Sequence, residues 1–233
     1  MKVTVVFVRV VTKPEYDHGA KRWAEAYNRF HAGHEHELVI INRYADPTDN
    51  LFLGAKQIRY DGGGWDCGAW QFAGKNIDTD LLVCFNSSTY VTGDNWLKRF
   101  VEAVEFYGVG LYGPLASYEV NWHIRTPCMV FQPEVIRDYP HTVETRDDTY
   151  RFECLSWPDG TPNFTQWVWK QRKLPVVAVY WSGAYQLENS RSPTNIFRRG
   201  DQSNLIVKDR HCEAYEVSDA EGKRTLERLA DGT

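Results

Sequence analysis

The chain opens with Val3-Thr4-Val5-Val6-Phe7-Val8-Arg9-Val10, and a second apolar run, Leu38-Val39-Ile40-Ile41, follows closely. Both runs are nearly continuous and rich in β-branched residues, which is the pattern of strands buried on both faces. Between them, residues 19–30 place apolar side chains at the spacing of an amphipathic helix. This strand–helix–strand order predicts a parallel sheet with a right-handed crossover.

The same alternation continues along the chain. Further strands are predicted at residues 57–60, 81–85, 109–112, 128–131 and 176–180. A further helix is predicted to follow the glycine-rich stretch of residues 61–68 and to run through residue 73. Others are predicted at residues 96–107, 164–170 and 221–230. After residue 182 the sequence is polar and turn-rich, and no repeat or linker divides it. We therefore predict an α/β fold with a mainly parallel central sheet flanked by helices, in a single domain of residues 1–233.

The composition indicates an ordinary globular protein. Hydrophobic residues make up 42% and charged residues 25% of the 233 residues, so no disulfide or metal is needed to build a core. The five cysteines are scattered and lack CxxC spacing, and we expect reduced thiols in a cytoplasmic protein. We expect neither a signal peptide nor a transmembrane segment. The net charge of −4 argues against a protein that wraps nucleic acid.

A glycine-rich loop, Asp61-Gly62-Gly63-Gly64-Trp65-Asp66-Cys67-Gly68, lies between a predicted strand and a predicted helix. Glycines such as Gly63 let the backbone approach a ligand closely. The helix that follows would direct its free N–H groups at an anion such as a diphosphate. The flanking Asp61 and Asp66 are natural acceptors for ribose hydroxyls. The spacing is neither GxGxxG nor a P-loop, and a turn with solvated aspartates is an equally good interpretation.

The strand at residues 81–85 ends in Asn86-Ser87-Ser88. These neutral side chains are poor ligands for Mg²⁺ or Mn²⁺. The alternative is that they hydrogen-bond the strand end and begin a turn. The pattern argues against a strong, fixed metal site.

Residues 117–126 form a polar and aromatic loop that contains His123 and Arg125. Such a loop suits a sugar, and Arg125 suits a phosphate, although a single histidine is equally well explained as a structural residue. Glu153 has apolar neighbours, so burial would raise its pKa into a range useful for a general base. At least one of Asp147 and Asp148 is interpreted as a loop charge.

Near the end of the chain, Arg198 and Arg199 precede Gly200. Two adjacent arginines beside a turn could neutralise a diphosphate leaving group. The alternative is a solvated basic loop balanced by Asp201.

Taken together, these segments resemble the GT-A-fold (Rossmann-like) glycosyltransferases, near the bacterial and phage proteins of the rhamnan-synthesis and rhamnosyltransferase-like group. The resemblance extends from the first strand to about Tyr215 and depends on the order of several stretches. These are residues 60–66, 82–88 with Trp96-Leu97, 112–114, 123–126 and 197–205. It implies a nucleotide-binding half of about residues 1–110 and an acceptor-binding half of about residues 111–233.

The resemblance also implies ligands and residue roles. The donor would be a UDP-, GDP- or dTDP-sugar, and the acceptor a carbohydrate or other hydroxyl compound. The implied nucleotide contacts are Val8, Asp61, Gly63 and Asp66, with Asn86, Ser87 and Ser88 at the position of the family's DxD motif. The missing DxD leaves dependence on Mn²⁺ or Mg²⁺ open.

For catalysis, the resemblance places Glu153 in the region of the catalytic base. Arg125 or the pair Arg198 and Arg199 would stabilise the departing nucleoside diphosphate, with His123 nearby. His211 lies near the end of the chain, where some members of the family contact a metal or a phosphate, and this match is weak.

Three alternatives remain open from the sequence. The absent DxD suits a catalytically inactive relative that only binds a nucleotide or glycan. A nucleotidyltransferase normally has a basic glycine-rich loop after the first strand, whereas residues 10–14 supply one lysine and no glycine. In a phage setting the acceptor would be a modified DNA base, which a basic face at Arg191, Arg198 and Arg199 would accommodate. The oligomeric state is not indicated.

Overall fold

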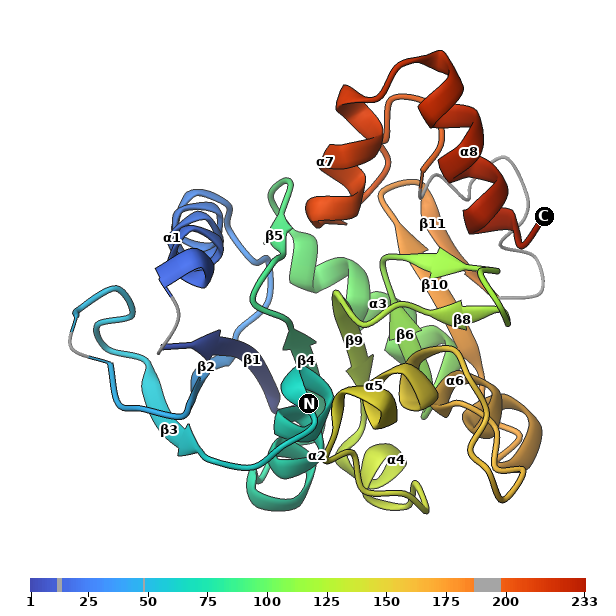
Figure 1. The fold of residues 1–233 in the computed structure, drawn as a ribbon. Coiled ribbons are helices and arrows are strands. Elements are labelled where there is room, and N and C mark those ends of the chain that lie inside the picture. The colour runs from blue at the N-terminus through green and yellow to red at the C-terminus, as the bar shows by residue number, and fades with distance from the viewer. Residues whose placement is uncertain (12–13, 48, 187–197) are drawn as a thin grey trace.

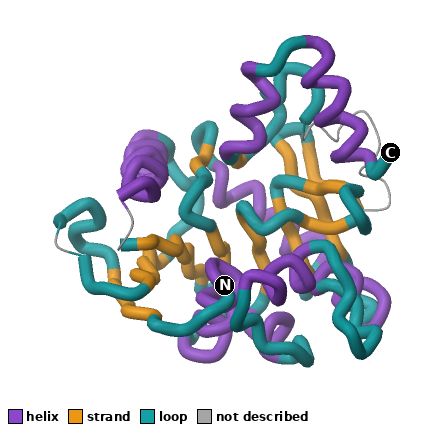
Figure 2. Tube along the Cα trace, viewed as in Figure 1, coloured by secondary structure: helices purple, strands orange, loops and turns teal. Residues whose placement is uncertain are grey.

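A computed structural model of the chain places an eight-stranded sheet at its centre, with helices on both faces (Figures 1 and 2). The structure describes residues 1–11, 14–47, 49–186 and 198–233. Arg191, part of the predicted basic face, lies outside the described residues. Among the described helices, none combines the length and the apolar character needed to cross a membrane.

The strand order of the central sheet is β11-β10-β6-β9-β4-β1-β2-β3. Its strands are β1 (Val3–Val10), β2 (Glu37–Arg43), β3 (Lys56–Tyr60), β4 (Leu81–Phe85), β6 (Leu111–Gly113), β9 (Cys128–Phe131), β10 (Val176–Tyr180) and β11 (Gly183–Gln186). Strands β3, β2, β1 and β4 are parallel neighbours, as are β6 and β10. Strand β9 runs antiparallel to β4 and β6, and β11 antiparallel to β10. The predicted mainly parallel α/β fold is confirmed, and the sheet takes strands from both predicted halves.

Two layers of helices bury the two faces of this sheet. One layer contains α1 (Pro14–Arg29) and α3 (Trp96–Tyr107); the other contains α2 (Trp65–Asn76), α4 (Pro133–Arg137), α5 (Arg146–Glu153), α6 (Phe164–Gln166) and the π-helical turn η1 (Trp167–Gln171). In β1, Val5 and Phe7 pack in the first layer, while Val6 and Val8 pack in the second. Because both faces are covered, the strand appears in the sequence as an unbroken apolar run.

Two small antiparallel pairs and two helices complete the fold. They are β5 (Tyr90–Val91) with β12 (Val207–Lys208), β7 (Ala116–Ser117) with β8 (His123–Ile124), α7 (Arg210–Val217) and α8 (Ala220–Asp231). Because β12 pairs with β5, the C-terminal segment returns to the region that follows β4 (Figure 1). Of these elements, the sequence predicted only the helix at residues 221–230.

Helix α5 begins at a capping box that the sequence analysis did not recognise. The Thr145 hydroxyl accepts a hydrogen bond from the Asp148 N–H at 3.1 Å, and the Asp148 carboxylate accepts from the Thr145 N–H at 2.9 Å. This exchange satisfies two backbone donors at the helix start. The interpretation as loop charges was wrong, because Asp147 and Asp148 lie in the first turn of this helix.

The glycine-rich loop packs against the segment that leads into α5. The Gly64 N–H donates to the Glu144 carbonyl at 2.7 Å. A Cβ on Gly63 would lie 1.9 Å from the Glu144 oxygen, and one on Gly64 would lie 1.9 Å from the Val143 oxygen. The glycines therefore allow the start of α2 to lie directly on this backbone.

We expect Gly64→Ala to lower the free energy of unfolding by about 3 kcal/mol, since the new Cβ overlaps a backbone oxygen in a left-handed conformation. The matched control is Gly160→Ala, because Gly160 has a φ of 87° but no atom within 4 Å of its Cβ position. That variant should lose only about 1 kcal/mol, the cost of the left-handed backbone. Urea denaturation measures both losses, and equal losses would contradict the packing argument.

Candidate functional site

A cavity of about 550 Å³ lies at the carboxyl ends of the parallel strands. Val10 ends β1, Arg43 ends β2 and residues 86–88 follow β4, and all of them line it. In an open parallel sheet, ligands bind where neighbouring strands connect in opposite directions. Here that point lies between β1 and β4, and the cavity opens beside it.

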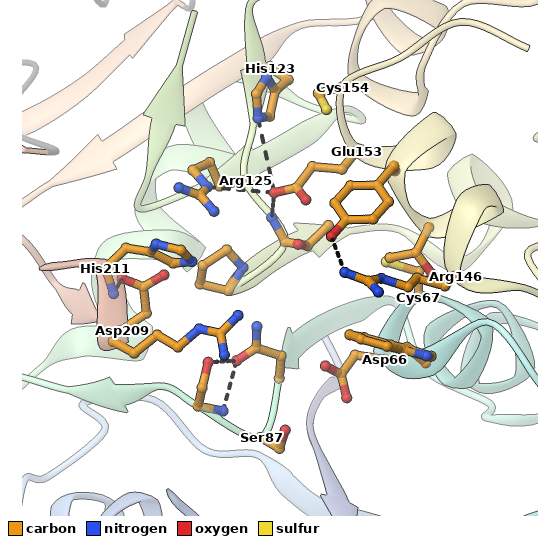
Figure 3. A pocket seen from close by; sticks show the side chains of 18 of the residues that line it. Asp66, Cys67, Ser87, His123, Arg125, Arg146, Glu153, Cys154, Asp209 and His211 are labelled. Carbon is orange, nitrogen blue, oxygen red and sulfur yellow. Dashed lines mark hydrogen bonds and ion pairs between the residues drawn. The ribbon is translucent and has the colours of Figure 1, made fainter. Parts of the chain in front are cut away.

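The cavity brings together most of the residues predicted from the sequence (Figure 3). Those that line it are Asp66, Asn86, Ser87, Ser88, His123, Arg125, Glu153, Arg198 and His211. Figure 3 shows Asp209 and His211 on one side, Asp66 and Arg146 on the other, and Arg125 with Glu153 between them, below His123.

Four predicted residues, all of them described, lie away from the cavity. The Val8 side chain is buried in the core, and Val10 lines the cavity in its place. Asp61 is exposed and forms an ion pair with Arg59 at 2.8 Å. Gly63 packs against the segment before α5, and Arg199 forms an ion pair with Asp231.

Several cavity residues were not predicted. They are Tyr16, Arg43, Tyr44, Arg146, Asp209 and Arg210, with Trp65, Glu119, Thr149 and Tyr150 lying in segments that the sequence analysis considered without assigning these residues a role of their own. Two signals were present in the sequence. Arg43 lies two residues after a predicted strand, and Arg146 and Tyr150 precede Glu153 at helical spacing, which the Thr145 capping box would have revealed.

Glu153, at the end of α5, lies among cationic and donor groups. Its Oε1 is 3.5 Å from Arg125 Nε and 4.0 Å from His123 Nε2, and it accepts a hydrogen bond from the Thr126 N–H at 3.2 Å. Burial alone would raise the pKa of Glu153, but Arg125, His123 and the Thr126 N–H together lower it below its usual value. The expected upward shift was therefore wrong, and Glu153 is ionised at neutral pH.

Cationic side chains crowd another wall of the cavity. Burial and the proximity of Arg125 lower the pKa of Arg198. Burial also lowers the pKa of His211, and Arg125, Arg198 and Arg210 lower it further. Asp209, which accepts from the His211 N–H at 3.0 Å, is the buried anion in this group. Such crowding of cations favours the binding of an anion.

Asp66, in the first turn of α2, carries a carboxylate oxygen without a partner. Its Oδ1 is buried and accepts no hydrogen bond from the described residues. Burial raises the pKa of Asp66 to about 6, although Arg43 acts in the opposite direction. A buried acceptor left unsatisfied is costly in the unliganded protein, and a ligand that donates to it removes that cost.

The turn after β4 uses its polar groups internally. Asn86 Oδ1 accepts hydrogen bonds from the Ser88 N–H at 2.9 Å and from the Ser88 hydroxyl at 3.0 Å. This is the turn-forming role that the sequence analysis weighed as an alternative. Within the described ranges, no three His, Cys, Asp or Glu side chains gather in a way that could hold a metal ion.

No protein-family model and no curated protein matches the chain. Among solved structures, it is similar to HddC from Yersinia pseudotuberculosis, at 15% identity and a TM-score of 0.45, over 62% of this chain and 83% of that one. It is similar to S. aureus TarS at 13% identity and a TM-score of 0.46, over 64% of this chain and 32% of TarS. A third is a protein of Desulfovibrio desulfuricans G20 provisionally assigned as a nucleotide-diphospho-sugar transferase, at 13% identity and a TM-score of 0.44, over 76% and 79%. At TM-scores below 0.5, these similarities establish neither the family nor the activity of the chain.

Proposed function

We propose that the chain is a glycosyltransferase that binds a nucleotide sugar in this cavity and transfers the sugar to a hydroxyl acceptor. The observation that carries the proposal is the crowding of Arg125, Arg198 and Arg210 on one wall of a cavity at the strand ends. Arginine side chains in a partly enclosed site bind phosphate oxygens and stabilise a departing diphosphate. These residues belong to the predicted acceptor-binding half, so both halves would contribute to the donor site.

The nucleoside would occupy the part of the cavity where β1 and β2 end. Val10, Arg43 and Asp66 lie there, and the unpartnered Asp66 oxygen would accept from a ribose hydroxyl or a ring N–H. The donor would be a UDP-, GDP- or dTDP-sugar. The arginines would neutralise the diphosphate directly. A comparison of nucleotide binding with and without Mn²⁺ tests whether a divalent metal ion, Mn²⁺ or Mg²⁺, assists them.

Glu153 would act as the general base. The acceptor hydroxyl gives its proton to the carboxylate while its oxygen bonds to the anomeric carbon. The bond from that carbon to the diphosphate oxygen breaks, and the diphosphate leaves with the electron pair. The lowered pKa keeps Glu153 ionised at neutral pH, which is the form that can accept a proton. Arg125 and His123 would hold it in position.

One observation favours a second candidate, a protein that binds a nucleotide or glycan without turnover. Arg125 and the Thr126 N–H already engage the Glu153 carboxylate, which makes it a weaker base.

The test of donor binding is a thermal-shift screen with UDP, GDP, CDP and dTDP and their common sugars, each with and without Mn²⁺. We expect one nucleotide, at about 100 times its Kd, to raise Tm by about 5 °C or more. Arg198→Ala should abolish the shift, whereas the neighbouring Arg199→Ala should retain it, because Arg199 pairs with Asp231 outside the cavity. Arg210→Ala makes the same test as Arg198→Ala at an exposed position of the same wall. No shift with any nucleotide would refute the proposal.

A further inference from the structure

Two exposed aromatic side chains stand at the rim of the cavity. Trp65 is 44% exposed and Tyr150 is 42% exposed, and both line the cavity. The Arg146 guanidinium lies 5.7 Å from the centre of the Trp65 ring and 5.6 Å from that of the Tyr150 ring. It also donates a hydrogen bond to the Tyr150 hydroxyl at 3.2 Å. Arg146 therefore fixes the two rings as one platform, which we call the rim platform.

The backbone at Trp65 adopts an energetically unfavourable conformation. Its φ is 50°, a left-handed conformation that a bulky side chain rarely adopts. The preceding Gly64 is anchored, because its N–H donates to Glu144 and its carbonyl accepts from the Thr149 hydroxyl at 3.2 Å. A strained, half-exposed tryptophan contributes little to the core, and backbone strain of this kind clusters at ligand sites.

The rim platform adjoins the proposed base. Arg146, Tyr150 and Glu153 follow one another on α5 at spacings of four and three residues, so they share one face of the helix. Figure 3 shows Arg146 and Glu153 pointing into the same cavity. A group bound on the platform would therefore lie beside the carboxylate that receives the acceptor proton.

The charges around the platform disfavour one kind of acceptor. Glu144 and Asp147 are exposed and lie within two positions of Arg146 in the chain, and Asp148 lies in the same helix turn; burial would raise the pKa of Asp148, but its capping hydrogen bonds lower it. Three carboxylates would repel the phosphates of a nucleic acid. An uncharged sugar ring has an apolar face for the aromatic rings and hydroxyls for Arg146.

We propose that Trp65, Arg146 and Tyr150 form the acceptor subsite, and that the acceptor is an uncharged glycan whose terminal sugar ring stacks on Trp65. This inference rests on the proposed function, since it assigns the acceptor side of the same site.

The test uses the full chain with a saturating nucleoside diphosphate and a panel of methyl pyranosides of glucose, galactose, mannose, rhamnose and N-acetylglucosamine. Saturation-transfer NMR should show contact between at least one sugar ring and the wild-type protein. Affinity for it should fall by about tenfold in Trp65→Ala. Tyr150→Phe keeps the ring but removes the hydroxyl that Arg146 contacts. It should weaken pyranoside binding less than Trp65→Ala does. The control is Trp169→Ala, which removes a tryptophan 37% exposed that packs on Trp122 away from the cavity.

Four outcomes would overturn the inference. One is that no pyranoside contacts the wild-type protein, and a second is that Trp65→Ala binds the pyranoside as tightly as the wild type does. Another is that Trp65→Ala weakens nucleotide affinity and leaves pyranoside contact unchanged, which would assign the platform to the donor. The fourth is binding of a single-stranded oligonucleotide that depends on Trp65. If instead pyranosides bind through Trp65 but no nucleotide binds, the proposed function fails while the sugar subsite stands. If Trp65→Ala does not fold, Trp65→Phe gives the comparison with a ring retained.

Discussion

Glu153→Gln should lower the rate of sugar transfer by about 10² to 10⁴-fold, the usual contribution of a general base. The amide keeps the size of the side chain but cannot accept the acceptor's proton. Nucleotide affinity should not fall, because the lost proton acceptor acts in the transition state and the variant removes a negative charge beside Arg125. The measurement is kcat at saturating donor, with nucleotide affinity measured separately. Since neighbouring cations and the Thr126 N–H overcome burial and lower the pKa of Glu153, the acid limb of the wild-type rate profile should lie below the ordinary glutamate value.

The control for this variant is Glu119→Gln. Glu119 also lines the cavity and its charge acts on Arg125 and on Arg198, which is 3.6 Å away, but its side chain is 42% exposed and it makes none of the contacts that hold Glu153. It should keep most of the activity. A folded Glu153→Gln protein that transfers sugar as fast as the wild type would remove Glu153 from the role of base.

Asp66→Asn should stabilise the protein and weaken donor binding. Because burial raises the pKa of Asp66 to about 6, the folded protein holds the proton more tightly than the unfolded chain does. The stability from this group is therefore present below about pH 4 and is lost as pH rises through about 6, a loss of roughly 3 kcal/mol. The amide does not titrate, so the variant should lack this loss. The denaturation midpoints of the wild type and of Asp66→Asn between pH 4 and pH 8 measure this loss of stability.

The same variant should bind the donor at least about tenfold more weakly, because an interaction with a charged acceptor is replaced by one with a neutral amide. Asp61→Asn is the matched control, since Asp61 flanks the same glycines but pairs with Arg59 at the surface. It should leave donor affinity unchanged. An Asp66→Asn protein with the pH dependence and affinity of the wild type would refute the assignment of Asp66 to the donor site.

Much of the fold was predictable because its strands are buried on both faces. The strands at residues 128–131 and 176–180 and the helix at residues 96–107 have the bounds read from the sequence. Helix α7 was missed because only Cys212 and Tyr215 of its residues are buried, which leaves no periodic apolar pattern. Strand β11 was missed because each of its residues is at least partly exposed.

The site was predictable by region but not by side chain. Asp61 and Asp66 look equivalent in the sequence, yet α2 begins between them, so only Asp66 lies in the first turn that borders the cavity. Arg198 and Arg199 are adjacent, yet one is buried at the cavity and the other pairs with Asp231. The pKa of Glu153 depends on Arg125, a partner distant in sequence that only the fold brings within 3.5 Å.

The central claim, that the cavity transfers sugar, is tested most directly by the release of nucleoside diphosphate from the nucleotide sugar that the thermal-shift screen selects. The wild-type protein should release it, a glycan acceptor should accelerate the release, and Glu153→Gln should suppress it although the variant still binds the donor. If the wild-type protein binds the nucleotide sugar but releases diphosphate no faster than Glu153→Gln, with or without acceptor, the chain binds its ligand without turnover and the account is contradicted.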